Sequence, residues 1–450
     1  MAAAVAAAVL GQGCSTGGSF SSSDRLRLQV LYENPDVAPG AVVAVPDSRR
    51  PVVVAENAVL EFGRRWRVAR HVLLSEEYST YRGWSSLGHP YHIPPCVTAD
   101  GRILLTRQKP ARSRDDAGNM VVKHEDELVL MDVHDPARIE TIISAPGAID
   151  WFDARLSDGR GMVIVGWSES MTGSTRVLVA RCVGSGSWET VWSSDRDWPR
   201  FVGLYGVVDD CKDGGLAALI YGLSESLPKG EFLLIQVPES GEHAVREIGR
   251  SVAWTPEERK GVARNLHLFG HMRTEGGIRL VFEHDVRGAY PETLVADSQG
   301  RMRKLDLGAD VCGLVDASDG SDAMILLSDH RSHTFSIYDV GSGKRVVQID
   351  AGITHGDVEL AIPCDFDGDG SRDVIMFAPT MEADVTGLPG WQMGIAKGLD
   401  GGGLGPVVWN RFSLQPLSVQ VVDLDENGRD EIVLGLDDGQ RGCVQILGVR

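Results

Sequence analysis

The sequence predicts an all-β fold of repeated units, and three observations support this prediction. Short apolar runs rich in branched residues recur along the chain, with almost no helical 3.6-residue pattern. They recur with a mean period of roughly 54 residues, a spacing typical of repeat architectures. Each unit joins a turn-rich loop, an apolar strand, a polar connection and a second apolar strand. Such units are typical of the blades of a β-propeller.

Eight units can be followed along the chain. Their opening apolar runs lie at residues 51–54, 102–105, 162–165, 216–220, 278–282, 323–327, 374–377 and 432–434. Eight blades are therefore favoured, and seven is the alternative, because the units around residues 43–54 and 266–282 are degenerate. Residues 26–32 read as a strand without a loop of its own, and we expect them to complete the last blade and close the ring.

The most specific motif is an aspartate-rich loop at residues 365–373, called here the first aspartate loop. Asp365, Asp367, Asp369 and Asp373 occupy loop positions 1, 3, 5 and 9, with Gly370 at position 6. Calcium takes six to eight oxygen ligands, and a glycine lets the chain turn sharply around the ion. These four aspartates are therefore predicted calcium ligands.

A second copy follows at residues 423–431, the second aspartate loop. Its predicted ligands are Asp423, Asp425, Asn427 and Glu431, with Gly428 at position 6. Asparagine at position 5 can still offer an oxygen, although one negative charge fewer should weaken calcium binding.

Two other interpretations of these loops are possible. An EF-hand needs a glutamate at position 12, where this chain has Met376 and Leu434, and helices on both sides. The apolar runs that follow the loops are instead typical of buried strands. A polar turn without metal remains the other alternative.

The two aspartate loops resemble the FG-GAP repeat, also called the VCBS or integrin-α-like repeat. That family pairs a DxDxDGxxD loop, which binds calcium, with a β-propeller blade. The resemblance covers these two stretches only. It implies an exported protein that binds proteins or carbohydrates, and some related propellers are polysaccharide lyases.

Composition and charge limit the classes of partner. The formal net charge is −19, which argues against binding to nucleic acid or an anionic membrane. The same charge suits a protein that holds divalent cations. The expected organisation is an N-terminal segment, residues 1–24, followed by one propeller domain, residues 25–450.

The N-terminal segment resembles part of an export signal. An apolar Ala-rich run ends near Cys14, which precedes a Ser/Gly-rich stretch. This order resembles a bacterial lipoprotein, in which Cys14 would be lipidated, although no Lys or Arg precedes the apolar run. We expect an exported protein, lipid-anchored in the cell envelope or extracellular. A disordered Ala-rich tail is the alternative.

The predicted function is a non-enzymatic binding module for a carbohydrate or protein at the channel mouth, stabilised by Ca²⁺. The alternative is a polysaccharide lyase or other carbohydrate-active enzyme, in which His355 beside Asp357 would act as a base. No nucleophile elbow, phosphate-binding loop or zinc-protease motif supports an enzyme. Aromatic candidates for contact with a ligand, or for packing between blades, are Trp84, Trp151, Trp167, Trp198, Trp254 and Tyr205.

Overall fold

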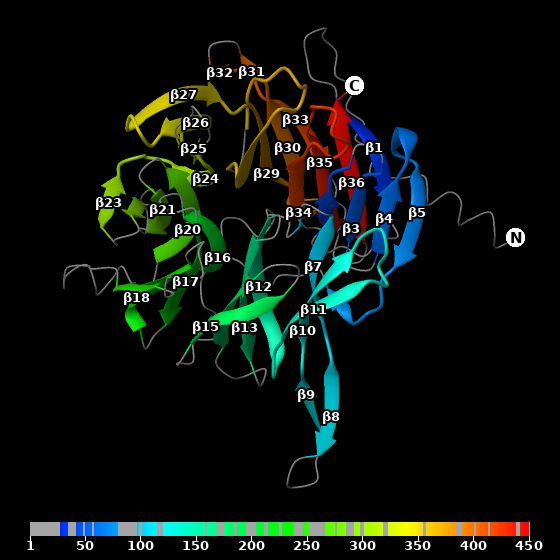
Figure 1. Cartoon of the computed structure of the whole chain (residues 1–450). Coiled ribbons are helices and arrows are strands. Elements are labelled where there is room, and N and C mark those ends of the chain that lie inside the picture. The colour runs from blue at the N-terminus through cyan, green and yellow to red at the C-terminus, as the bar shows by residue number, and fades with distance from the viewer. Residues whose placement is uncertain are drawn as a thin grey trace, which may run out of the picture.

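The computed structural model describes residues 28–449, except 35–41, 48–49, 56–57, 80–96, 99–100, 115–119, 158–159, 169–174, 184–186, 195–203, 211–214, 225–226, 238–245, 252–265, 275–276, 285–291, 298–300, 318–322, 354–356, 384–388, 400–401, 413–414 and 438–441. These residues form a β-propeller, in which the chain passes from sheet to sheet around a ring (Figure 1).

Eight antiparallel sheets have four strands each. The first contains β2 (Val43–Val45), β3 (Val52–Ala55), β4 (Ala58–Phe62) and β5 (Val68–Leu73). The second contains β6 (Tyr78–Ser79), β7 (Arg102–Arg107), β10 (Glu127–Asp132) and β11 (Ile139–Ser144). The third contains β12 (Ala148–Ser157), β13 (Arg160–Ser168), β14 (Arg176–Cys182) and β15 (Trp188–Ser193). The fourth contains β16 (Leu204–Asp210), β17 (Gly215–Ser224), β18 (Leu227–Val237) and β19 (Arg246–Ser251).

The remaining four-stranded sheets follow the same plan. The fifth contains β20 (Leu266–Thr274), β21 (Gly277–His284), β22 (Glu292–Asp297) and β23 (Met302–Leu305). The sixth contains β24 (Asp310–Val315), β25 (Met324–Asp329), β26 (Thr334–Asp339) and β27 (Lys344–Asp350). The seventh contains β28 (Leu360–Cys364), β29 (Asp373–Ala383), β30 (Pro389–Ala396) and β33 (Val408–Phe412). The last contains β34 (Gln415–Val422), β35 (Glu431–Asp437), β36 (Gly442–Val449) and β1 (Leu28–Asn34).

Three short elements among the described residues lie outside the four-stranded sheets. The hairpin β8 (Pro110–Arg114) and β9 (Met120–His124) is inserted between two strands of the second sheet and projects away from the ring (Figure 1). The pair β31 (Gly398–Leu399) and β32 (Gly403–Leu404) lies in the seventh sheet's last connection. A 3₁₀ turn, η1 (Arg64–Trp66), joins β4 to β5.

The first and last parts of the chain meet in one sheet. Strand β1 pairs antiparallel with β36, with Leu28 opposite Val449. The prediction of an all-β propeller closed by an N-terminal strand is therefore confirmed. Each of the predicted units corresponds to one four-stranded sheet among the described residues.

The apolar run that opens each predicted unit is the second strand of its sheet, and the sequence missed the innermost strand before it. One innermost strand, β34, carries polar residues that bond to the neighbouring sheet. On β34, buried Ser418 and Gln420 accept hydrogen bonds from the backbone N–H groups of Val42 (3.1 Å) and Ala44 (2.6 Å). These side chains satisfy buried backbone donors outside the strand ladders, and they interrupt the apolar pattern of β34.

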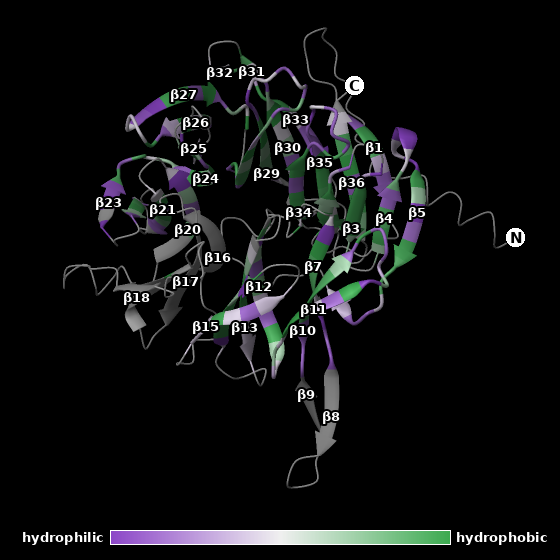
Figure 2. Ribbon diagram, in the orientation of Figure 1, coloured by the Kyte–Doolittle hydropathy of each residue, from purple (hydrophilic) through white to green (hydrophobic). Residues whose placement is uncertain are grey.

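The core lies between successive sheets. Phe377 of β29 and Leu434 of β35 are fully buried in one cluster shared by the last two sheets. Truncating such a side chain to alanine costs about 3–5 kcal/mol for Phe and about 2–5 kcal/mol for Leu. Burial falls toward the outer strands, so β27 is mostly exposed, with two half-buried residues, and shows mixed colouring in Figure 2.

Candidate metal-binding loops

The two aspartate loops lie at equivalent places in neighbouring sheets. The first connects β28 to β29, and the second connects β34 to β35. In each case an innermost strand turns into the apolar second strand of its sheet. Both loops therefore lie at the same face of the ring.

The same hydrogen bonds hold both loops. At position 1, Asp365 Oδ2 accepts from the Gly370 N–H at 3.1 Å, and Asp423 Oδ2 accepts from the Gly428 N–H at 2.8 Å. The position-9 carboxylates of both loops also accept a backbone N–H, in each case from the residue at position 2. The shared pattern shows that the sequence repeat is also a structural repeat.

Glycine at position 6 is required by the backbone. Gly370 and Gly428 have φ of 79° and 83°, the left-handed region that glycine adopts without steric cost. At position 4 the loops differ, because Gly368 has φ of 74° whereas Glu426 adopts φ of 54° with a side chain. The second loop therefore stores more backbone strain than the first.

Three carboxylates converge in each loop. Ligand atoms of Asp365, Asp367 and Asp373 lie within 4.8 Å of one another in the first loop. Those of Asp423, Asp425 and Glu431 do the same in the second loop.

Each cluster also holds a buried carboxylate oxygen without a donor. Asp365 Oδ1 and Asp425 Oδ1 are inaccessible to water and have no hydrogen-bond partner among the described residues. Such an oxygen is costly to bury unless a donor or a cation lies nearby. Hard oxygen ligands of this kind fit Ca²⁺.

Burial of the position-9 carboxyl groups makes their ionised forms unfavourable unless a cation is bound. Asp373 is fully buried and Glu431 is 4 % exposed. Burial raises the pKa of Asp373, and burial followed by the charges of Asp425 and Asp423 raises the pKa of Glu431 to about 7. A bound divalent cation would favour the ionised forms.

The two loops are joined to each other. The Asp430 side chain accepts the backbone N–H of Asp365 at 2.7 Å, and the Asp430 N–H donates to the Asp365 carbonyl at 3.0 Å. Asp430 was not a predicted ligand, because it lies at position 8. Its role depends on a partner 65 residues away, which the local motif does not reveal.

A lysine contacts the first loop only. Lys397 pairs with Asp367 and lies 3.1 Å from Asp369 Oδ2. These contacts raise the pKa of Lys397, and the Ser371 N–H and Lys397 lower the pKa of Asp369. In the second loop, no described lysine or arginine pairs with the carboxylates, so its charges are less compensated.

The position-5 residues stand apart from both clusters. Asp369 is exposed and accepts the Ser371 N–H at 2.7 Å. Asn427 is exposed, and its N–H donates to Asp423 Oδ1 at 2.8 Å. The structure thus brings together three of the four predicted ligands in each loop.

A third group of possible ligands lies at the opposite face. His330 Nδ1 is 3.2 Å from Asp310 Oδ2 and 3.9 Å from Asp357 Oδ2, at the ends of strands remote from the aspartate loops. No sequence motif marks this group.

Other candidate residues divide into two sets. Trp151 and Trp167 are 5 % and 7 % exposed and pack within the third sheet, so they are not available to a ligand. Cys14, Trp84, Trp198, Trp254 and His355 lie outside the described residues. Among the described residues, no helix is both long and apolar enough to cross a membrane.

Comparison with known proteins gives no family. No family model matches the chain, and no curated protein matches it. Solved structures resemble it in fold at very low sequence identity. A eukaryotic initiation factor has 10 % identity over 88 % of this chain and 90 % of that chain, with a TM-score of 0.41.

Two further structures show the same level of similarity. A streptogramin B lyase has 8 % identity over 94 % of this chain and 98 % of that chain, with a TM-score of 0.39. The β-propeller domain of the trilobed protease from Pyrococcus furiosus has 15 % identity over 78 % of this chain and 96 % of that chain, with a TM-score of 0.38. Similarity at this level carries no argument about function.

Proposed function

We propose that this chain is an exported, non-enzymatic β-propeller of the FG-GAP type, stabilised by Ca²⁺, that binds a carbohydrate or protein partner. The observation that carries the metal proposal is the buried, donor-free carboxylate oxygen in each aspartate loop, Asp365 Oδ1 and Asp425 Oδ1. Each of these oxygens lies in a group of three converging carboxylates.

The role of the metal is structural. In its absence, carboxylates of like charge repel one another in a partly buried place, and a divalent cation removes that repulsion. A ligand that binds only the native state stabilises it by about 2.7 kcal/mol at 100 times its dissociation constant. Because the loops are joined through Asp430 and Asp365, calcium in one should also hold the other in place.

The metal proposal is tested by titrating calcium into chelator-treated protein by calorimetry and by counting bound metal by mass spectrometry. We expect binding in the wild type, weaker binding after Asp425→Ala, and unchanged binding after Asp135→Ala, an exposed aspartate on another sheet. No bound calcium and identical melting with calcium and with EGTA would contradict the proposal.

The proposed partner site lies at the face of the ring that carries the aspartate loops. Propeller loops that gather at one face form a surface of fixed geometry, and ligands bind preferentially at loops held by a rigid scaffold. A glycan array probed with calcium-loaded protein tests it. Binding that survives in EGTA would separate the partner site from the metal.

A further inference from the structure

A pocket of about 850 Å³ lies between the first and second sheets. Its lining comes from the β2–β3, β4–β5 and β10–β11 connections and from the adjoining ends of β4 and β5. The three connections join first and second or third and fourth strands, so they lie at the face that carries the aspartate loops. The Asp47 N–H, at the pocket, donates to the Leu424 carbonyl of the second loop at 3.1 Å.

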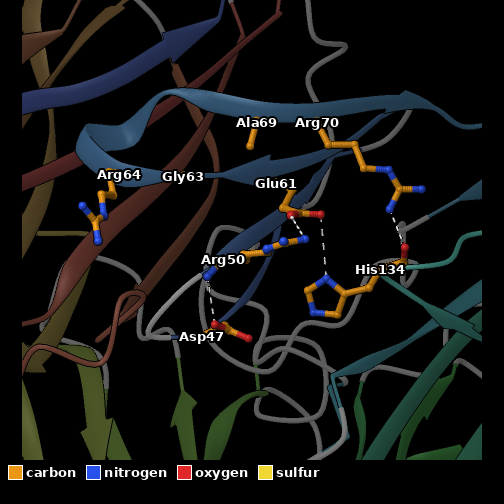
Figure 3. Close-up of a pocket in the computed structure, with 8 residues that line it drawn as sticks. All are labelled: Asp47, Arg50, Glu61, Gly63, Arg64, Ala69, Arg70 and His134. Carbon is orange, nitrogen blue, oxygen red and sulfur yellow. Dashed lines mark hydrogen bonds and ion pairs between the residues drawn. The ribbon is translucent and has the colours of Figure 1, made fainter.

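The acidic residues of this pocket are already paired. Glu61 is 5 % exposed, and its Oε1 accepts from Arg50 Nη1 at 3.2 Å. Its Oε2 faces His134 Nδ1 at 3.9 Å (Figure 3). Asp47 Oδ1 accepts the Arg50 N–H at 2.8 Å. The charges of Arg50 and Glu61 therefore compensate each other at the floor.

Two further arginines are not compensated by a carboxylate. Arg64 is exposed and has no hydrogen bond or ion pair with another described residue. Arg70 donates from Nη1 to the His134 carbonyl, a contact that holds its guanidinium at the pocket (Figure 3). A guanidinium has five donors in a planar fork, so this contact leaves others for a ligand.

The turn that contains Arg64 and leads into the strand of Arg70 is strained. Arg65 and Trp66 have φ of 60° and 57°, unusual for residues with side chains, and the Gly63 N–H closes the turn on the Arg67 carbonyl at 2.9 Å. Such strain tends to occur at functional sites. Four arginines lie within residues 64–70 of a chain whose net charge is −19, so positive charge is concentrated locally.

We propose that this pocket binds an acidic oligosaccharide, with one sugar carboxylate on Arg64 and another on Arg70, which lie at opposite ends of the pocket (Figure 3), and sugar hydroxyls donating to Glu61. The pocket combines cationic forks with a buried carboxylate acceptor. The forks match a carboxylate, and the acceptor matches the hydroxyl donors of a sugar, so the two features together fit an acidic sugar better than a simple anion. The volume lies in the usual range for small-ligand sites. This inference rests on the proposed function as a carbohydrate-binding module.

The test is calorimetric titration of the full chain with a glucuronate-containing tetrasaccharide, in calcium. Its carboxyl-reduced form and inorganic phosphate are the comparison ligands. We expect the acidic sugar to bind at least about tenfold more tightly than either, which corresponds to about 1.4 kcal/mol. The double substitution Arg64→Gln and Arg70→Gln should weaken acidic-sugar binding at least about tenfold, because it removes the charge-assisted hydrogen bonds to both sugar carboxylates.

Arg67→Gln is the matched control, because Arg67 is exposed on the same turn and does not line the pocket. It should bind like the wild type. Melting curves of all variants show whether weaker binding reflects loss of folding.

Equal binding of phosphate and of the acidic sugar would overturn the inference in favour of a general anion site. Sugar binding that is unchanged in the double variant would place the sugar elsewhere, rejecting the pocket and keeping the proposed function. No sugar binding at all would reject the pocket and the carbohydrate part of the proposed function. The calcium titration would still test the metal proposal separately.

Discussion

Replacing Glu431 with glutamine should change stability in opposite directions with and without calcium. Glu431 is buried at position 9 of the second loop, and its Oε2 accepts the Leu424 N–H at 2.9 Å. Burial is the main cause that raises its pKa from the usual 4.5 to about 7. Glutamine keeps an acceptor for Leu424 but carries no charge.

The sign of the metal-free effect follows from linkage. The native state holds the Glu431 proton more tightly than the unfolded chain, so the free energy of unfolding falls as pH rises from about 4.5 to about 7. A shift of this size corresponds to a loss of about 3 kcal/mol above pH 7, at 1.36 kcal/mol for each pH unit. Glutamine removes that loss, so the metal-free variant should be up to about 3 kcal/mol more stable than the wild type at pH 8.

Calcium reverses the comparison. The variant has one charged ligand fewer, so calcium should stabilise it less than the wild type. With an unfolding entropy of about 2.1 cal/mol/K per residue, about 3 kcal/mol corresponds to roughly 3 °C in melting temperature for a chain of this length.

The assay is calorimetric melting at pH 5 and pH 8, in EGTA and in calcium. Glu76→Gln, an exposed change on another sheet, is the control. A metal-free Glu431→Gln protein that melts below the wild type at pH 8 would refute the reasoning, as would an equal response of both proteins to calcium.

Three further predictions concern other parts of the ring. Burial raises the pKa of Glu283 to about 7 although its Oε1 accepts the Val311 N–H, so its contribution to stability falls as pH rises from about 4.5 through about 7. Glu283→Gln should therefore raise the melting temperature at pH 8 and not at pH 4, and an equal rise at both would contradict this. Gly313→Ala would place Cβ 2.3 Å from the Ala361 carbonyl oxygen, forcing neighbouring innermost strands apart, and should cost at least about 1–3 kcal/mol in urea unfolding. A cost below about 0.5 kcal/mol would show that these strands can shift freely. Lys397→Met removes the cation beside the first loop, so melting in EGTA should fall and the gain from calcium should grow; unchanged melting in both would mean that the lysine does not compensate this loop.

The sequence predicted what local patterns determine. The aspartate loops and the strands after them lie where spacing placed them, because position 6 needs glycine and the second strands are continuously apolar. The innermost strand β34 was missed, because Ser418 and Gln420 bond to a neighbouring sheet and break the apolar pattern, whereas β2 and β28 are apolar but short.

Other residues of the site were not predicted because they depend on contacts between distant segments. Asp430 and Lys397 act on the first loop from other connections, and nothing in their local sequence indicates the contact. Arg70 is held at the pocket by the His134 carbonyl in a turn of the second sheet, which its local sequence does not indicate. These residues belong to the site because of contacts between distant segments of the chain, and a local sequence motif cannot reveal such contacts.

The pairing of β1 with β36 makes assembly of the last sheet depend on both ends of the chain. Bringing together residues about 420 positions apart costs roughly 5 kcal/mol of chain entropy, by the logarithmic dependence on loop length. Until β36 is in place, β35 lacks its outer neighbour and β1 lacks its pairing partner. A chain lacking its final eight residues would leave two open strand edges, which could recruit a second molecule by exchange of strands.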